Sequence, residues 1–171
     1  MASIIRTYDR LVTGLGLLGG VIFLVMALGI GLDIVARNAT GGGIAWLVDV
    51  LEYAMLVATF LAAPWVLREG AHVTVDVLVA ALPRRLARWL DVGASALGTI
   101  ISAIIVFYSL RAAIQAYEQG SLILKTIVFP EWWPFAVVPF GMALLTVEFL
   151  RIFVRALREV HNPPRHAGER P

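Results

Sequence analysis

Two acidic residues near the start of one apolar segment, residues 44–67, are the first candidates for chemistry. Asp49 and Glu52 are three positions apart, so a helix would place both carboxylates on one side. An ionised carboxylate is costly in hydrocarbon, so an acid in a membrane helix indicates a function and a partner of opposite charge. Helical rise counted along the third apolar segment puts Arg111 at a similar depth. We therefore expect Arg111 to pair with Glu52 or Asp49, within one subunit or across an interface.

Three interpretations of these charged residues are open. They could form a structural or inter-subunit polar contact, they could couple proton or sodium movement to transport, or they could extend to the membrane surface. Coupling sites in transporters usually lie near the bilayer midplane, whereas Asp49 and Glu52 lie near the beginning of their segment. Their shallow depth favours the polar contact.

His72 is the remaining candidate, in the stretch LREGAHVTVDV that follows the second apolar segment. A zinc site needs more ligands than His72, Glu69 and Asp76 offer, and no nucleophile, base and orienting group occur together. We expect His72 to hydrogen-bond at a turn, Arg68 to anchor the cytoplasmic membrane surface, and Asp76 to cap a following helix. The sequence thus predicts no catalytic, cofactor or metal site, and no enzyme.

The elements that must position these residues are long and apolar. The 171 residues are 60% hydrophobic and 15% charged, whereas soluble domains average about 45–50% and about 25%. Four segments approach the roughly 20 residues that cross a bilayer, at about residues 11–35, 44–67, 87–117 and 131–155. These segments predict an all-α integral membrane protein, with one four-helix domain over residues 1–160 and a polar cytoplasmic tail over residues 161–171.

Basic residues are distributed unevenly among the connections. Arginines precede the first segment, lie between the second and third, and follow the fourth, whereas the other two connections hold only Arg37 and Lys125. By the positive-inside rule both termini and the middle connection are cytoplasmic. The middle connection also carries apolar residues at helical spacing, which predicts an interfacial amphipathic helix before a third helix that starts near Pro83. The net charge of +2 reflects this asymmetry and does not indicate nucleic-acid binding.

Two pairs of opposite charges are spaced to meet within a single helix. Asp33 and Arg37 are four apart at the outer end of the first span, and Glu148 and Arg151 are three apart at the inner end of the fourth. Residues at these spacings are neighbours on a helix surface, so each acid is expected to be neutralised by its own arginine.

Small residues at a spacing of four predict sites where helices approach closely. Gly16 and Gly20 form such a pair in the first span, and Ala94 and Gly98 form one in the third. Glycine is also simply common in membrane helices, which explains the pattern equally well.

Several polar, proline and aromatic residues follow one another in a distinctive order along the chain. They are Glu52 early in the second span, Arg68, His72 and Asp76 in REGAHVTVD, and Pro130, Trp132, Trp133, Pro139 and Gly141 in FPEWWPFAVVPFG. From Arg37 to about Arg155 the chain resembles the small membrane subunit of tripartite ATP-independent periplasmic (TRAP) transporters, the DctQ-like family. The resemblance lies in the order and spacing of these features and in the overall length of the chain.

The resemblance implies that the protein acts as a partner. In that family a periplasmic substrate-binding protein delivers an organic acid, and a large permease subunit of the bacterial inner membrane carries the substrate and sodium sites. The small subunit packs against the static part of the large one, so Asp49, Glu52 and Arg111 would be assembly contacts. Two alternatives stay open. One is a self-sufficient proton-coupled exporter, a homodimer with Glu52 as coupling acid, and the other is an anchoring subunit of a membrane redox enzyme.

Overall fold

The computed structural model describes residues 2–79, 84–120, 122–123 and 129–161. Within these ranges the side chains of residues 2–4, 71–79, 84, 85, 87, 129 and 159 lie outside the description. The elements are α1 (Ala2–Thr40), α2 (Ala45–Val79), α3 (Arg84–Gln119), β1 (Leu122–Ile123), β2 (Phe129–Pro130) and α4 (Trp132–His161).

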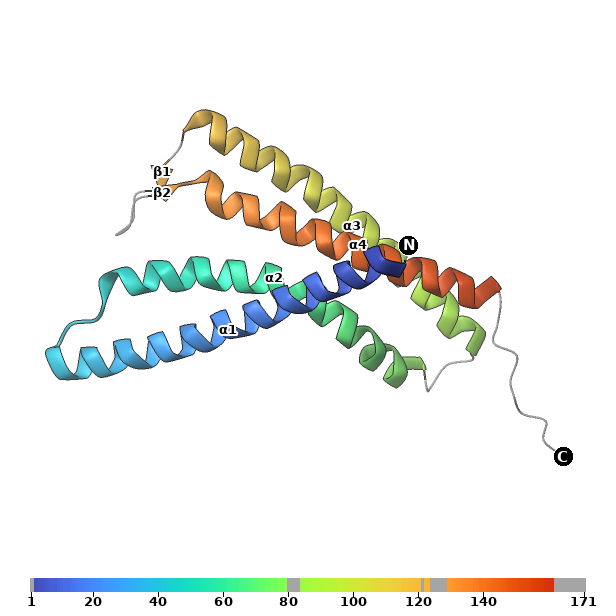
Figure 1. Cartoon of the computed structure of the whole chain (residues 1–171), viewed down its shortest axis with the longest axis horizontal. Coiled ribbons are helices and arrows are strands. Elements are labelled where there is room, and N and C mark those ends of the chain that lie inside the picture. The colour runs from blue at the N-terminus through green and yellow to red at the C-terminus, as the bar shows by residue number, and fades with distance from the viewer. Residues whose placement is uncertain (1, 80–83, 121, 124–128, 162–171) are drawn as a thin grey trace.

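The four helices form two antiparallel hairpins, α1 with α2 and α3 with α4, and Figure 1 shows them converging near the N-terminus. Away from that point the hairpins diverge, so the α1–α2 connection lies apart from β1 and β2. Contacts between α2 and α4 join the hairpins, whereas α2 and α3 barely touch. We call the converging region the basic end, and the region of residues 40–45 and β1–β2 the strand end.

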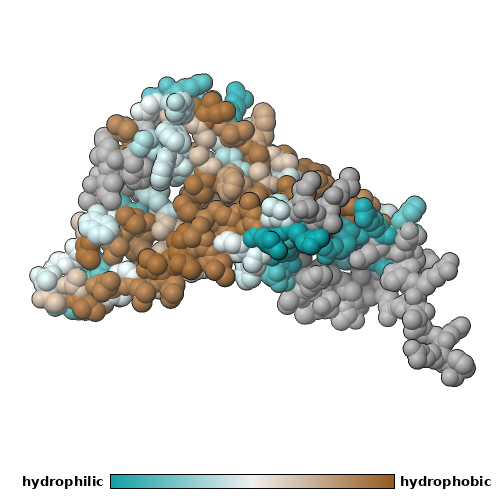
Figure 2. Space-filling view, in the orientation of Figure 1, coloured by the Kyte–Doolittle hydropathy of each residue, from teal (hydrophilic) through white to brown (hydrophobic). Residues whose placement is uncertain are grey.

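Each helix is long and apolar enough to cross a membrane, which confirms the predicted all-α class with four membrane helices. Each contains one predicted span, to within one residue at its start. Large apolar side chains cover much of the outer surface, and Figure 2 shows them as a broad band beside the hydrophilic residues of the basic end. Helices suit this setting because they satisfy every backbone polar group internally. The cytoplasmic placement of both termini stays a prediction.

Two of the four predicted small residues lie at close helix contacts. A Cβ atom at Gly16 would lie 2.6 Å from the Trp65 side chain of α2, and one at Gly98 would lie 2.6 Å from the Phe149 ring of α4. Glycine therefore lets each hairpin close tightly around an aromatic side chain. Gly20 faces open space. The spacing of small residues therefore identified helices that pack closely, but not every residue of the pair lies at the contact.

The predicted interfacial helix is not a separate element. The structure continues α2 as one helix to Val79, with no break at Gly70. A single glycine costs a helix interior only about 1 kcal/mol, so it does not end the helix. Instead α2 changes direction about midway (Figure 1), where Pro64 lies inside the helix and withholds a backbone donor. α3 begins at Arg84, near Pro83 as predicted.

Two sets of contacts hold together the two ends of the connection between α3 and α4. Two short antiparallel strands pair Leu122 with Pro130, and the Tyr117 and Trp132 rings meet edge to face at 5.8 Å. These contacts hold the end of α3 against the start of α4 at the strand end.

Candidate functional site

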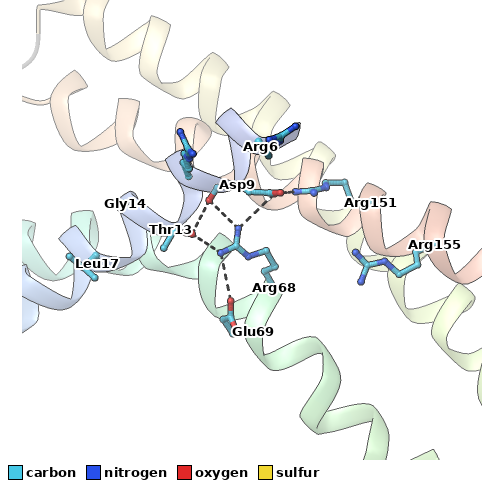
Figure 3. A pocket seen from close by; sticks show the side chains of 10 residues that line it. Arg6, Asp9, Thr13, Gly14, Leu17, Arg68, Glu69, Arg151 and Arg155 are labelled. Carbon is cyan, nitrogen blue, oxygen red and sulfur yellow. Dashed lines mark hydrogen bonds and ion pairs between the residues drawn. The ribbon is translucent and has the colours of Figure 1, made fainter. Parts of the chain in front are cut away.

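Charged residues from three helices meet at the basic end, with Asp9 of α1 at the centre (Figure 3). Arg151 of α4 donates to Asp9 Oδ1 at 2.7 Å, and Arg68 of α2 lies 3.8 Å from the same oxygen. Arg68 also donates to the Asp9 carbonyl at 3.2 Å and to Thr13 Oγ1 at 2.8 Å. The start of α1 is thereby fastened to both of the helices that join the hairpins.

A buried acid completes this group, which we call the three-helix cluster: Asp9, Arg68, Glu148 and Arg151. Glu148 is only 2% exposed, and its Oε1 lies 3.3 Å from Arg151 Nη1. The Arg151 guanidinium also lies 5.2 Å from the centre of the Tyr8 ring, whose hydroxyl donates to the Leu144 carbonyl. A buried carboxylate is compatible with a stable fold when it is paired in this way, whereas removing its partner strongly destabilises the protein.

The sequence predicted part of the three-helix cluster. The Glu148–Arg151 pair is confirmed, and Arg68, predicted as a surface anchor, holds α1 as well. Asp9 was missed, although an acid placed among arginines at the border of an apolar segment was a usable signal. Its partner Arg151 lies 142 residues away in sequence, so only the fold brings them together.

The second confirmed pair lies at the strand end. Arg37 Nη2 is 3.1 Å from Asp33 Oδ2, and the other oxygen of Asp33 accepts a hydrogen bond from the Ile44 N–H at 2.6 Å. Asp33 therefore neutralises Arg37 and also fixes the chain where it enters α2. The backbone contact depends on an eleven-residue separation that helix periodicity does not predict.

The predicted pairing of Arg111 with Glu52 or Asp49 is not formed within the described part of this chain. Arg111 and Glu52 are exposed on α3 and α2, and these two helices barely contact one another. Asp49 is partly buried, and both acids have polar or electrostatic partners elsewhere. The geometry leaves Arg111 facing outward, so a pairing across a subunit interface stays a prediction.

The other predicted site residues divide into two groups. Arg68 belongs to the three-helix cluster, whereas the side chains of His72 and Asp76 lie outside the described part of the structure. Among the described residues, no three His, Asp or Glu side chains are grouped closely enough to hold a metal ion.

A pocket of about 680 Å³ opens beside the three-helix cluster, lined by residues of α1, α2 and α4. Arginine side chains predominate on its walls, and Figure 3 shows Arg6, Arg68, Arg151 and Arg155 around it. Guanidinium groups donate several hydrogen bonds in a fixed plane, so this arrangement suits an anion.

Comparison with known proteins gives two matches. Residues 26–159 match the family described as "Tripartite ATP-independent periplasmic transporters, DctQ component". The chain is also similar to "Ectoine TRAP transporter small permease protein TeaB" of Halomonas elongata, 23% identical over 158 residues, which cover 92% of this chain and 81% of that protein. No solved structure matches the chain. The family match includes Arg68, Glu148 and Arg151 but begins after Asp9.

Proposed function

Since the chain belongs to the DctQ component family of tripartite ATP-independent periplasmic transporters, we propose that it scaffolds the large permease subunit of such a transporter. In this proposal a periplasmic binding protein delivers a small organic acid to the complex in the bacterial inner membrane. The large subunit carries the acid inward together with sodium. The chain described here supplies a rigid membrane surface and no substrate site.

One observation in particular supports a scaffolding role. The sequence has no charged residue between Arg10 and Asp33, and the two acids that flank this apolar stretch, Asp9 and Asp33, are both ion-paired. Asp9 and Asp33 are separated by 24 positions on one helix, or about 36 Å at about 1.5 Å per residue. That separation is close to the roughly 30 Å of bilayer hydrocarbon. The ion pairs therefore suit the two membrane faces, where Asp9 joins α1 to α4 and Asp33 also holds the entry to α2 through the Ile44 N–H.

The apolar stretch between these ion pairs favours a scaffold over a coupling subunit. Coupling groups of transporters usually lie near the midplane, within reach of the ions that they carry. Here the carboxylates of α1 are held by arginines at its two ends, at 2.7 Å and 3.1 Å. The intervening surface is apolar and suits packing against another membrane protein.

Reconstitution tests the proposal. The purified chain is placed in proteoliposomes alone, with the large permease subunit, or with that subunit and the binding protein. Uptake of radiolabelled organic acids, and of the ectoine named for the relative, is followed under an inward sodium gradient. We expect uptake only when all three proteins are present.

The exporter alternative gives the opposite result. Transport by the chain alone, driven by a proton gradient and lost in Glu52→Gln, would replace the scaffold with a self-sufficient carrier. Uptake by the large subunit and binding protein at an undiminished rate without the chain would also contradict the proposal.

A further inference from the structure

The pocket beside the three-helix cluster carries a surplus of positive charge. Its arginines are Arg6, Arg10, Arg68, Arg151 and Arg155. Two carboxylates, those of Asp9 and Glu69, also line it, so five positive charges face two negative ones. Arg6 has a further polar or electrostatic partner. Without Arg6, and counting Glu148, which lies behind Arg151 without lining the pocket, the arginines still exceed the acids by one among the described residues. A pocket with this balance attracts an anion.

The arginines of the pocket differ in how they are used. Arg68 and Arg151 are held by Asp9 and help to join the helices. Arg10 and Arg155 are exposed and form no ion pair with any described residue. They come from α1 and α4, the first and last helices of the fold, and line the same pocket. Each of these guanidinium groups presents several donors in a fixed plane, so either can donate to a phosphate group that enters the pocket.

An apolar stripe begins inside the pocket and continues along α1. Gly14 and Leu17 line the pocket, and Val21, Leu24 and Leu28 follow Leu17 at helical spacing on the same face. The four large side chains are between 49% and 71% exposed. The stripe therefore runs from a cationic pocket into the part of the helix that suits bilayer hydrocarbon.

These two features together specify a ligand with a negative head and apolar chains. We propose that the pocket binds the phosphate group of an anionic phospholipid, from the leaflet that surrounds the N-terminus, with an acyl chain lying along the α1 stripe. Basic pockets between membrane helices bind anionic headgroups in this way. A soluble phosphate ester would use the arginines but would not contact the stripe. The stripe is one part of the apolar α1 surface between Asp9 and Asp33, and the lipid site does not depend on the substrate that the complex carries.

Lipid binding to the whole chain in detergent tests the proposal. Native mass spectrometry would compare dioleoylphosphatidylglycerol with dioleoylphosphatidylcholine at equal concentration. We expect the anionic lipid to be preferred, and Arg10→Gln with Arg155→Gln to weaken its binding about thirty-fold, since each arginine near a membrane surface contributes about five-fold. Replacing the same two arginines by lysine keeps the charge and should keep most of the preference.

A matched control separates a site from general surface charge. Arg88→Gln with Arg158→Gln removes two arginines of the basic end that do not line the pocket, and should leave the lipid preference nearly unchanged. An equal loss in the control pair would overturn the proposal, as would a wild-type chain that does not distinguish the two lipids. Displacement of the lipid by millimolar inorganic phosphate would assign the pocket to a soluble anion instead.

Discussion

Replacing Asp9 by asparagine should loosen the junction between the two hairpins. The change keeps the size of the side chain and the backbone carbonyl that Arg68 contacts, but it removes the charge that Arg151 approaches at 2.7 Å. Arg151 would retain Glu148 at 3.3 Å, and Arg68 would retain Glu69 at 3.6 Å. The substitution therefore weakens both ion-pair networks without leaving either arginine unpaired.

The loss of stability expected for Asp9→Asn depends on how exposed the arginine partners of Asp9 are. The side chains of Arg68 and Arg151 are 24% and 31% exposed, between a surface pair and a buried one. Surface pairs contribute about 0.2–1 kcal/mol, and breaking a fully buried pair costs about 3–5 kcal/mol. We expect Asp9→Asn to lower the free energy of unfolding by about 1–2 kcal/mol, since a second acid remains for each arginine.

Unfolding in mixed micelles of dodecylmaltoside and sodium dodecyl sulfate, followed by circular dichroism, measures this change. Glu69→Gln is the matched control, because Glu69 is 59% exposed and contacts Arg68 only at 3.6 Å. It should cost at most about 0.5 kcal/mol. In a double-mutant cycle Asp9→Asn and Arg151→Gln should be non-additive, since they remove the same contact. An Asp9 variant as stable as the control, or strict additivity in the cycle, would show that the Asp9–Arg151 contact does not stabilise the junction.

Three further predictions concern packing, assembly and orientation. Gly141→Ala should destabilise the chain by about 1–3 kcal/mol in the same assay, since the added Cβ would lie 2.7 Å from the backbone of α2, whereas Gly20→Ala meets open space and should be neutral or stabilising. Equal stability of these two variants would contradict the packing. Arg111→Ala should reduce recovery of the complex with the large subunit, and combining it with Glu52→Gln should restore part of the loss, unless the two residues act independently. A cysteine at Gly42 should react with an impermeant thiol reagent added from the periplasmic side, and labelling only from the cytoplasm would reverse the orientation.

Features that depend on one helix alone could be predicted from the sequence. The four membrane helices follow from apolar length, and the pairs Asp33–Arg37 and Glu148–Arg151 follow from helical spacing. No knowledge of neighbouring helices is needed for either. The family resemblance, carried by the order of matching residues, is confirmed by the match over residues 26–159.

Features that depend on the relative placement of helices could not be predicted. The contact of Asp9 with Arg151 requires the first and last helices to meet, which periodicity does not specify. Similarly, the sequence does not show that Gly16 meets a neighbour while Gly20 faces outward. The predicted break after the second span failed for a local reason, because one glycine and a kink at Pro64 redirect a helix without ending it.

The two hairpins diverge from a single fastened region (Figure 1), so a small rotation there would be amplified along the helices, as in a lever. The three-helix cluster acts as its pivot, and the arm along α1 from Asp9 to Asp33 is about 36 Å long at about 1.5 Å per residue. A rotation of about 5° at the pivot displaces the far end of such an arm by about 3 Å. The contacts that join the hairpins include the arginine pairs of the three-helix cluster and the packing of Gly141 against Phe60, and together they set how far apart the hairpins stand at the strand end.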